Sequence, residues 1–359
     1  MSTGKRNWHY ASGGFSLIEL MIAMVISLIL LIGVTQIFLS SSATNRAQEG
    51  LSRVQENARF AIDVLGQDIR MAGHTGCPRS TSPEPVVMAN DADAGFITSG
   101  RSVIGVEDGA SAGNDFWING VPEDLVAGQP AIRVTFSSGD EISAVPGSFG
   151  NSAEFDIDSN AIGFRQNDFI TITDCVTAHI AEITRNPEDD DGDSINISHG
   201  QGGGSDGGGN DPHRWGDAET GTQNYDEGAQ AMQYYSYTFY IAENEAEEPA
   251  LYRRDDMRSS GQAEVIELVS NVEEMRIQYG QDTNADFQVN RYRSADQLSG
   301  ADWDNVLSVR VALLFASGEV LSEERATAFN MLGDEIPTPA DRRVRQMATT
   351  TISLRNRLQ

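Results

Sequence analysis

The chain has 359 residues and a formal net charge of −28. This charge argues against a nucleic-acid partner, because phosphate backbones are bound by Lys and Arg side chains. The length allows one large domain or two modest ones. Lys5 is the only lysine, and we interpret the acidic surface mainly as a source of solubility.

An apolar segment near the N-terminus is long enough to cross a membrane. Residues 20–39 contain no charged side chain, and a helix of that length, at about 1.5 Å per residue, spans a hydrocarbon layer of about 30 Å. Lys5 and Arg6 precede it, and residues 1–18 contain no acid. Because positive flanks stay in the cytoplasm, we expect a cytoplasmic N-terminus, a single pass through the inner membrane and a periplasmic remainder.

A cleaved secretory signal peptide is the alternative interpretation, with residues 40–43 as its small-residue cleavage site. The apolar run is longer than the usual 7–15 residues of such a peptide, and it carries Glu19 near its start. The sequence Gly14-Phe15-Ser16-Leu17-Ile18-Glu19 resembles the class III signal of type IV prepilins. This resemblance implies that residues 1–14 are a leader, and that prepilin peptidase cleaves between Gly14 and Phe15. It also implies that the same enzyme N-methylates Phe15.

Glu19 needs an explanation, because a carboxylate at the centre of a membrane helix costs about 2.5–3.5 kcal/mol on insertion scales. Cleavage after Gly14 would create a positive amine on Phe15, one helical turn before Glu19. We expect Glu19 to compensate that amine in its own chain or in a neighbouring subunit, which would set the register of assembly. The alternative is a glutamate near the interface that simply reaches water.

The helix is expected to continue beyond the membrane. Residues 15–40 form its transmembrane half, and residues 41–72 form an amphipathic half that ends at Gly73. Two pairs of opposite charge, Glu49–Arg53 and Arg59–Asp63, have i,i+4 spacing. The apolar stripe, which we expect to pack on the protein's own sheet, consists of Leu51, Val54, Ala58, Ala61, Leu65, Ile69 and Ala72.

Residues 73–359 are expected to form a β-rich domain outside the cytoplasm. β-Branched and aromatic runs predict strands at 131–136, 168–175, 234–243, 306–315 and 347–356. The segment 263–280 is interpreted as a short helix or turn that leads into a strand, and the Asp- and Gly-rich stretch 185–228 as a flexible loop insertion. The expected class is α+β, a pilin-like long helix packed on a mainly antiparallel sheet.

The resemblance to pilins extends past the signal. The segments that look like the PilW family of pilus assembly proteins are 53–77, 234–254, 269–292, 303–315 and 351–357. This family implies a minor pilin of a type IV pilus, with roles in cell adhesion and twitching motility. The minor pilin would prime assembly and sit at or near the filament tip. Its partners would be other minor pilins, the major pilin, a large tip adhesin and the inner-membrane assembly platform.

Two other functions stay open at this point. A J-type pseudopilin of type II secretion would share the helix, the processing and the fold. A membrane-anchored secreted hydrolase would need a catalytic group, but the sequence contains no HExxH, GxSxG or P-loop motif. We therefore expect no enzymatic activity.

The two cysteines fit an exported domain. Cys77 follows the expected helix end and Cys175 lies at the end of an expected strand. An oxidising compartment favours a disulfide between them, and free buried thiols are the alternative. Metal ligation by cysteine is not expected, because no CxxC spacing occurs.

Two acidic segments suggest calcium, although no cofactor is expected to be required. The first resembles an EF-hand loop but has Phe287 in place of the turn glycine and Arg293 in place of the last ligand. Its candidate ligands are Asp282, Asn284, Asp286 and Asn290. The second segment offers Asp189, Asp191 and Asp193. Solvated acidic loops are the alternative in both places.

The prepilin signal makes a direct prediction about processing. The mature protein should begin with N-methyl-Phe15, and Gly14→Ala should weaken or block cleavage, because the scissile junction is altered. Mass spectrometry of the N-terminal peptide from membrane preparations measures both. A mature chain that begins at Thr44 would indicate an ordinary signal peptidase and would contradict the pilin interpretation.

Overall fold

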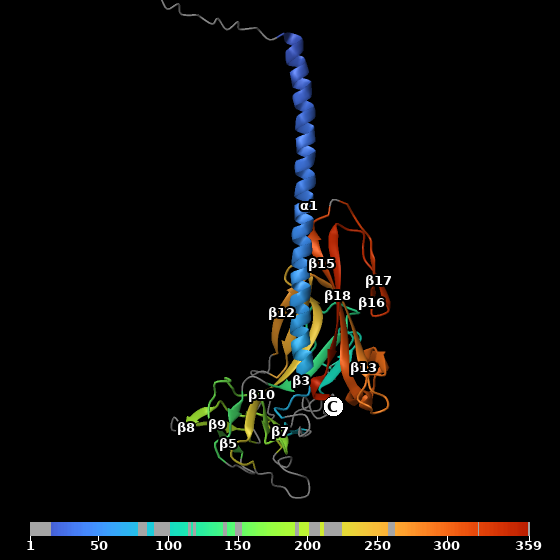
Figure 1. Cartoon of the computed structure of the whole chain (residues 1–359). Helices are drawn as coiled ribbons and strands as arrows, with labels where there is room; N and C mark the ends of the chain where they lie inside the picture. The colour runs from blue at the N-terminus through green and yellow to red at the C-terminus, as the bar shows by residue number, and fades with distance from the viewer. Residues whose placement is uncertain are drawn as a thin grey trace, which may run out of the picture.

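The computed structural model describes residues 16–77, 85–89, 101–113, 116–117, 120–138, 142–147, 153–190, 194–200, 209–211, 225–257, 263–321 and 323–357. A long apolar helix, α1 (Leu17–Met71), is followed by a mainly antiparallel β-domain (Figure 1). The predicted α+β, pilin-like fold is confirmed.

The largest sheet has nine strands in the order β1-β7-β6-β10-β11-β12, with β3 and β4 also paired to β10 and β2 to β3. Its pairs are antiparallel except β1 with β7. The bounds are β1 (Val86–Val87), β2 (Val103–Val106), β3 (Ala131–Ser137), β4 (Ser143–Ala144), β6 (Phe169–Thr173), β7 (Ala178–Glu182), β10 (Gln230–Glu243), β11 (Pro249–Asp255) and β12 (Glu264–Ser270).

Three smaller sheets and three 3-10 helices complete the described part of the chain. The four-stranded sheet β14-β13-β15-β18 contains β13 (Val272–Gln281), β14 (Arg291–Arg293), β15 (Val306–Glu319) and β18 (Arg343–Ser353). The three-stranded sheet contains β5 (Glu154–Ile157), β8 (Glu188–Asp190) and β9 (Ser194–Ser198), and the hairpin contains β16 (Ala328–Met331) and β17 (Asp334–Pro337). The 3-10 helices are η4 (Ala295–Gln297), η5 (Gly300–Asn305) and η6 (Arg355–Arg357).

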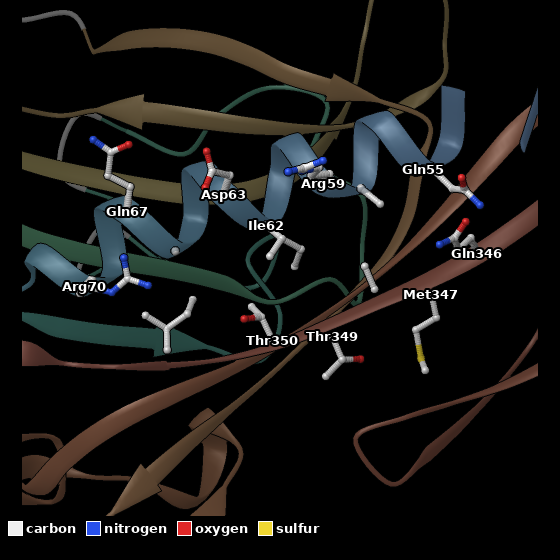
Figure 2. A pocket seen from close by; sticks show the side chains of 14 residues that line it. Gln55, Arg59, Ile62, Asp63, Gln67, Arg70, Gln346, Met347, Thr349 and Thr350 are labelled. Carbon is white, nitrogen blue, oxygen red and sulfur yellow. The ribbon is translucent and has the colours of Figure 1, made fainter. Parts of the chain in front are cut away.

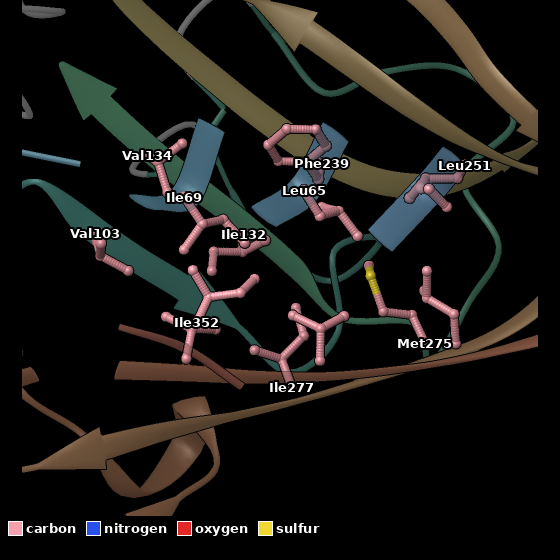
Figure 3. Close-up of a cluster of buried hydrophobic side chains, with 14 of the residues drawn as sticks. Leu65, Ile69, Val103, Ile132, Val134, Phe239, Leu251, Met275, Ile277 and Ile352 are labelled. Carbon is pink, nitrogen blue, oxygen red and sulfur yellow. The ribbon is translucent and has the colours of Figure 1, made fainter. Parts of the chain in front are cut away.

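The second half of α1 completes the main core. Leu65 and Ile69, both fully buried, pack in one cluster with side chains from the nine-stranded sheet, such as Phe239, and from the four-stranded sheet, such as Ile277 and Ile352 (Figure 3). The helix therefore holds the two sheets together through one apolar face. The predicted packing of this stripe on the protein's own β-structure is confirmed for Val54, Ala58, Ala61, Leu65, Ile69 and Ala72.

Leu51 was also placed in the stripe, and this was wrong, because its side chain is 39% exposed. At that level the helix approaches the domain through Gly50 instead. A Cβ at Gly50 would lie 3.1 Å from Val320 Cγ2, so glycine permits this close approach and a larger residue would require the Val320 side chain to shift by a few tenths of an ångström.

The C-terminal end of α1 is tied to the domain by hydrogen bonds. The Asn356 side-chain amide donates to the main-chain oxygens of Met71 and Ala72, each at 3.2 Å. Gly73 has a φ of 76°, and its N–H donates to the Thr135 oxygen in β3 at 2.9 Å. The Asn356 bonds satisfy carbonyl groups that a helix end leaves without intrahelical partners. The Gly73 bond ties the residue after the helix end to β3.

The predicted disulfide between Cys77 and Cys175 is present. It joins the segment that follows α1 to the turn between β6 and β7, across a sequence separation of 98 residues. In the chain-entropy model, closing a loop of that length stabilises the folded state by about 4–5 kcal/mol. The bond adds a covalent restraint just beyond the hydrogen-bonded helix end.

Two expectations about local structure were wrong, the first of them only in part. The strand expected at the end of 263–280 is present as β13, but the short helix or turn expected before it is another strand, β12. The two strands pair in different sheets on either side of Asn271 (φ 60°). Pairing with β11 and β15 overrides the local helical pattern. The stretch 185–228 includes the strands β8 and β9, because Ile197 is buried opposite Phe155 of β5. Neither Glu49–Arg53 nor Arg59–Asp63 forms an ion pair, although the structure describes all four residues.

The contacts of Asn356 predict a measurable loss of stability. Asn356→Ala should lower the free energy of unfolding by about 1–2 kcal/mol, because two partly buried carbonyls lose their donor. The neighbouring Arg355→Ala, at an exposed position, serves as the matched control and should change stability by less than about 0.5 kcal/mol. Urea unfolding of the full chain in detergent, followed by tryptophan fluorescence, compares them. Equal midpoints for Asn356→Ala and the wild type would contradict this role.

Candidate assembly site

Glu19 lies in the first turn of α1 and is exposed. Its N–H donates to the Ser16 oxygen at 3.0 Å, and its carboxylate makes no hydrogen bond or ion pair with another described residue. A carboxylate in the first turn is favourably placed relative to the helix dipole. Gly14 and Phe15, the predicted cleavage pair, lie outside the described residues. The structure therefore places the carboxylate but not the amine that we expect it to compensate.

The first half of α1 exposes a continuous apolar surface. The most apolar 18-residue stretch of this helix has a mean hydropathy of 2.8, and none of it is buried. Within the described residues, no other helix is long and apolar enough to cross a membrane. Leu17 is 78% exposed and Ile37 is 72% exposed. In water such a surface would be costly, so it requires lipid or the helices of other subunits around it.

Hydroxyl groups on this half of the helix are satisfied internally. Ser27 Oγ donates to the Ala23 oxygen at 2.7 Å, and Thr35 Oγ1 donates to the Leu31 oxygen at 2.8 Å. These bonds to the preceding turn reduce the cost of placing a hydroxyl in lipid. Glu19 is the single charged side chain of residues 17–39, and the described structure leaves its charge uncompensated.

The boundary between exposed and buried helix falls at Gly50, the first buried residue of α1. From Glu19 to Gly50 the helix runs about 47 Å, at about 1.5 Å per residue. Figure 1 shows this part projecting from the domain as a free stalk. A partner for Glu19 cannot come from the β-domain of the same molecule, because the stalk separates them.

The buried half of α1 carries one carboxylate that the sequence analysis did not single out. Asp68 is 9% exposed, and its Oδ2 accepts a hydrogen bond from Arg253 Nη1 of β11 at 3.2 Å. The same guanidinium lies 4.3 Å from the centre of the Tyr237 ring. Burial raises the pKa of Asp68, and Arg253 opposes this rise. Nothing in a single sequence links Asp68 to a residue so distant in the chain, so no local signal could have found this pair.

The EF-hand-like loop lies between β13 and β14, and the Asp282 carboxylate organises it. It accepts hydrogen bonds from the main-chain N–H groups of Asn284 at 3.1 Å, Ala285 at 2.8 Å and Phe287 at 2.8 Å. Although burial opposes the effect, these N–H donors hold the pKa of Asp282 below its usual range. The carboxylate is thus already engaged by its own loop.

The other candidate calcium ligands are arranged as follows. Asp286 Oδ2 accepts a bond from the Asn284 amide at 3.0 Å, and Asn290 Oδ1 accepts the Thr283 N–H at 2.7 Å. Asp189 lies in β8, where it pairs with Ile195 of β9, and Asp191 and Asp193 lie outside the described residues. Within the described residues, no three His, Cys, Asp or Glu side chains gather closely enough to hold a metal. Calcium binding stays a prediction.

The structure places two buried histidines close to each other that the sequence analysis did not single out. His179 of β7 and His199, which follows β9, are 2% and 3% exposed. His179 Nδ1 lies 2.6 Å from the Tyr225 hydroxyl, and burial lowers the pKa of His199 to about 4. The His199 imidazole is therefore neutral near pH 7, and both side chains are part of the buried interior.

An exposed apolar helix with a carboxylate in its first turn, anchored in an α+β domain, defines the class of type IV pilin-like proteins. Residues 10–35 match the prokaryotic N-terminal methylation motif, and residues 238–356 match the family described as type IV pilus-assembly protein W. The predicted resemblance to the PilW family is confirmed. The second match runs from β10 to η6 and includes the whole four-stranded sheet. No curated protein and no solved structure matches the chain.

A calcium test with two variants can distinguish the carboxylate that holds the loop together from one that would bind only the metal. If the loop binds calcium, millimolar Ca²⁺ should stabilise the full chain relative to EDTA, by about 2.7 kcal/mol at a hundred times Kd. Asp286→Ala should remove that gain but leave the stability in EDTA nearly unchanged. Asp282→Ala should lower stability in both conditions, because three main-chain donors lose their acceptor. Identical melting curves of the wild type in Ca²⁺ and in EDTA would indicate that both acidic segments are solvated loops that bind no calcium.

Proposed function

We propose that this protein is a minor pilin that primes assembly of a type IV pilus and sits at or near the filament tip. The observation that carries the proposal is the free stalk of α1, with an uncompensated carboxylate at its far end. The type IV pilus-related assignment itself follows from the two family matches. Priming and tip position go further, and they are supported by what the family resemblance implies.

The division of α1 into an exposed apolar half and a half buried in the domain suits a subunit that moves from the membrane into a filament. Before assembly, lipid covers the apolar stalk, with the N-terminus in the cytoplasm and the β-domain in the periplasm. After assembly, helices of neighbouring subunits replace the lipid, and the domain lies at the surface of the pilus. The contacts of Asp68, Asn356 and the disulfide hold the buried half of α1 in the domain, so the stalk transfers as one unit with it.

Glu19 fixes the axial position of the subunit when it enters the filament. After cleavage by prepilin peptidase, the amine of Phe15 in one subunit attracts the Glu19 carboxylate of its own or an adjacent chain. In an apolar filament core an unpaired carboxylate is costly, so only the axial position that pairs it with an amine is favoured. The partners are then the inner-membrane assembly platform, other minor pilins, the major pilin and a large tip adhesin, and the role is structural and not enzymatic.

A J-type pseudopilin is the second candidate, because it would use the same helix and processing. The match to type IV pilus-assembly protein W over residues 238–356 favours the pilus. Mass spectrometry of proteins that co-purify with sheared filaments distinguishes them: pilus subunits are expected, and a secretion apparatus alone would favour the pseudopilin.

The role of Glu19 predicts a defect in assembly without a defect in insertion. Glu19→Ala should insert and be cleaved after Gly14, since the junction is unchanged and a charge leaves the apolar run. The variant should accumulate in the inner membrane and be depleted from sheared pili. Glu19→Gln keeps the size of the side chain but loses the charge, and it should behave nearly like Ala.

Glu49→Gln is the matched control, because Glu49 is an exposed carboxylate on the same helix outside the apolar segment. It should enter filaments at the wild-type level. Quantitative immunoblots of membrane and filament fractions measure all three variants. Wild-type amounts of Glu19→Ala in filaments would show that this carboxylate sets no register, and that it simply reaches water at the membrane interface.

A further inference from the structure

A groove runs between the buried half of α1 and β18. It has a volume of about 760 Å³, and it is lined by residues of α1 between Gln55 and Arg70 and by residues of β18 between Gln346 and Ile352. Figure 2 shows Ile62 and Arg70 directed from the helix toward the strand. The groove is remote from Glu19 and takes no part in the register described above.

The strand that forms one wall is the edge of its sheet. β18 pairs with β15 on one side, and it is terminal in the order β14-β13-β15-β18. In an antiparallel strand, alternate residues direct their N–H and C=O groups away from that single neighbour. In the described part of the chain, the main chain of residues 346–352 makes no hydrogen bond outside the β15 ladder.

The edge is also unprotected. The register shift between β15 and β18 falls between Ala316 and Glu319, and residues 346–352 contain no proline and no charged side chain. Bulges, prolines and lysines are the usual features that prevent an edge strand from pairing. This segment of β18 therefore presents a regular template for one more strand.

The other wall leaves space where a side chain would normally stand. Gly66 lies inside α1, in its C-terminal part, and glycine within a helix costs about 1 kcal/mol relative to alanine. A Cβ at Gly66 would have only Arg70 Nη2 within 4 Å, at 4.0 Å, so packing within the molecule does not demand a glycine here. Its effect is to keep the groove open beside β18.

Several polar groups in the groove have no partner within the described part of the chain. Arg59 and Arg70 line it and are exposed, and neither forms an ion pair with a described residue. Gln346 Oε1 is buried without a hydrogen bond in the described structure. Asp63 is the single carboxylate among the lining residues, so the groove carries net positive charge on a chain whose total is −28.

We propose that this groove binds an extended acidic segment of a neighbouring subunit, which adds to β18 as a further strand. Main-chain hydrogen bonds to the open edge give the affinity, and the two arginines select carboxylates, as in other strand additions. That the donor is a filament subunit rests on the proposed function, whereas the strand addition itself does not.

The spacing of the arginines defines the segment. Arg59 and Arg70 are separated by about 16 Å along the helix axis at about 1.5 Å per residue. An extended chain covers that distance in about five residues at about 3.3 Å each. Because side chains on one face of a strand recur every second residue, acids four residues apart (about 13 Å) and six residues apart (about 20 Å) bracket this distance. The flexible arginine side chains can reach the shorter spacing.

The test uses the full-length protein in detergent micelles and a fluorescein-labelled peptide. The peptide alternates threonine and valine and carries glutamates at its second and sixth positions. A matched peptide has lysines there, and another has a central proline, which removes a main-chain donor. Fluorescence anisotropy should show the acidic peptide binding at least about tenfold more tightly than either, with an affinity that falls as salt rises.

Variants connect this binding to the groove. Arg59→Glu, alone and with Arg70→Glu, should weaken binding of the acidic peptide, by about tenfold for the pair. Arg53→Glu, an exposed arginine of the same helix outside the groove, should leave it unchanged. Gly66→Leu should block binding by filling the space beside β18. Melting temperatures near the wild-type value establish that each variant is folded.

Two outcomes would overturn the proposal. Equal binding of the acidic and lysine peptides, or no effect of Arg59→Glu and Gly66→Leu, would show that the groove is not the binding site. Self-association of the purified chain that Gly66→Leu abolishes, without peptide binding, would assign the groove to a second copy instead. Either result leaves the proposed pilin function intact, because that function is judged by the filament incorporation of the Glu19 variants.

Discussion

Burial of one face of α1 between two sheets is the constraint on which the rest of the molecule depends. The nine-stranded and four-stranded sheets share a single cluster of apolar side chains, and the stripe from Val54 to Ile69 lies within it. Removing a buried leucine such as Leu65 from a core of this kind typically costs 2–5 kcal/mol. The helix is therefore an integral layer of the domain, although it is also the membrane anchor.

This double use of one helix explains the placement of the other features. The polar contacts that fix the helix end, through Asn356 and the Thr135 oxygen, and the Cys77–Cys175 bond all gather at the end far from the membrane. The opposite end has no such restraint, and Glu19 is the single charged side chain on its exposed, mainly apolar surface over residues 17–39. Force or displacement applied to the stalk would accordingly be transmitted to the domain through the buried stripe.

Much of this arrangement could be predicted from the sequence, because it rests on local patterns. The uncharged run, the 3.6-residue stripe and the β-branched strands each carry their own signal, and the structure contains the helix and all five expected strands. The wrong expectations share a cause. Whether 263–280 became helix or strand was decided by pairing with β11 and β15, and the burial of Leu51 depended on where the domain ends along the helix. The Asp68–Arg253 pair and the open edge of β18 depend on tertiary contacts that no local pattern reports.

Hydrogen–deuterium exchange of the full chain in detergent micelles tests the central claim most directly. The account predicts that main-chain amides of residues 54–69 exchange only on global unfolding, because the stripe is locked between two sheets. Amides of residues 41–49, in the same helix but outside both the domain and the apolar segment, should exchange much faster. Equal protection of the two segments, or faster exchange of residues 54–69, would contradict a helix that is built into the domain at one end and free at the other.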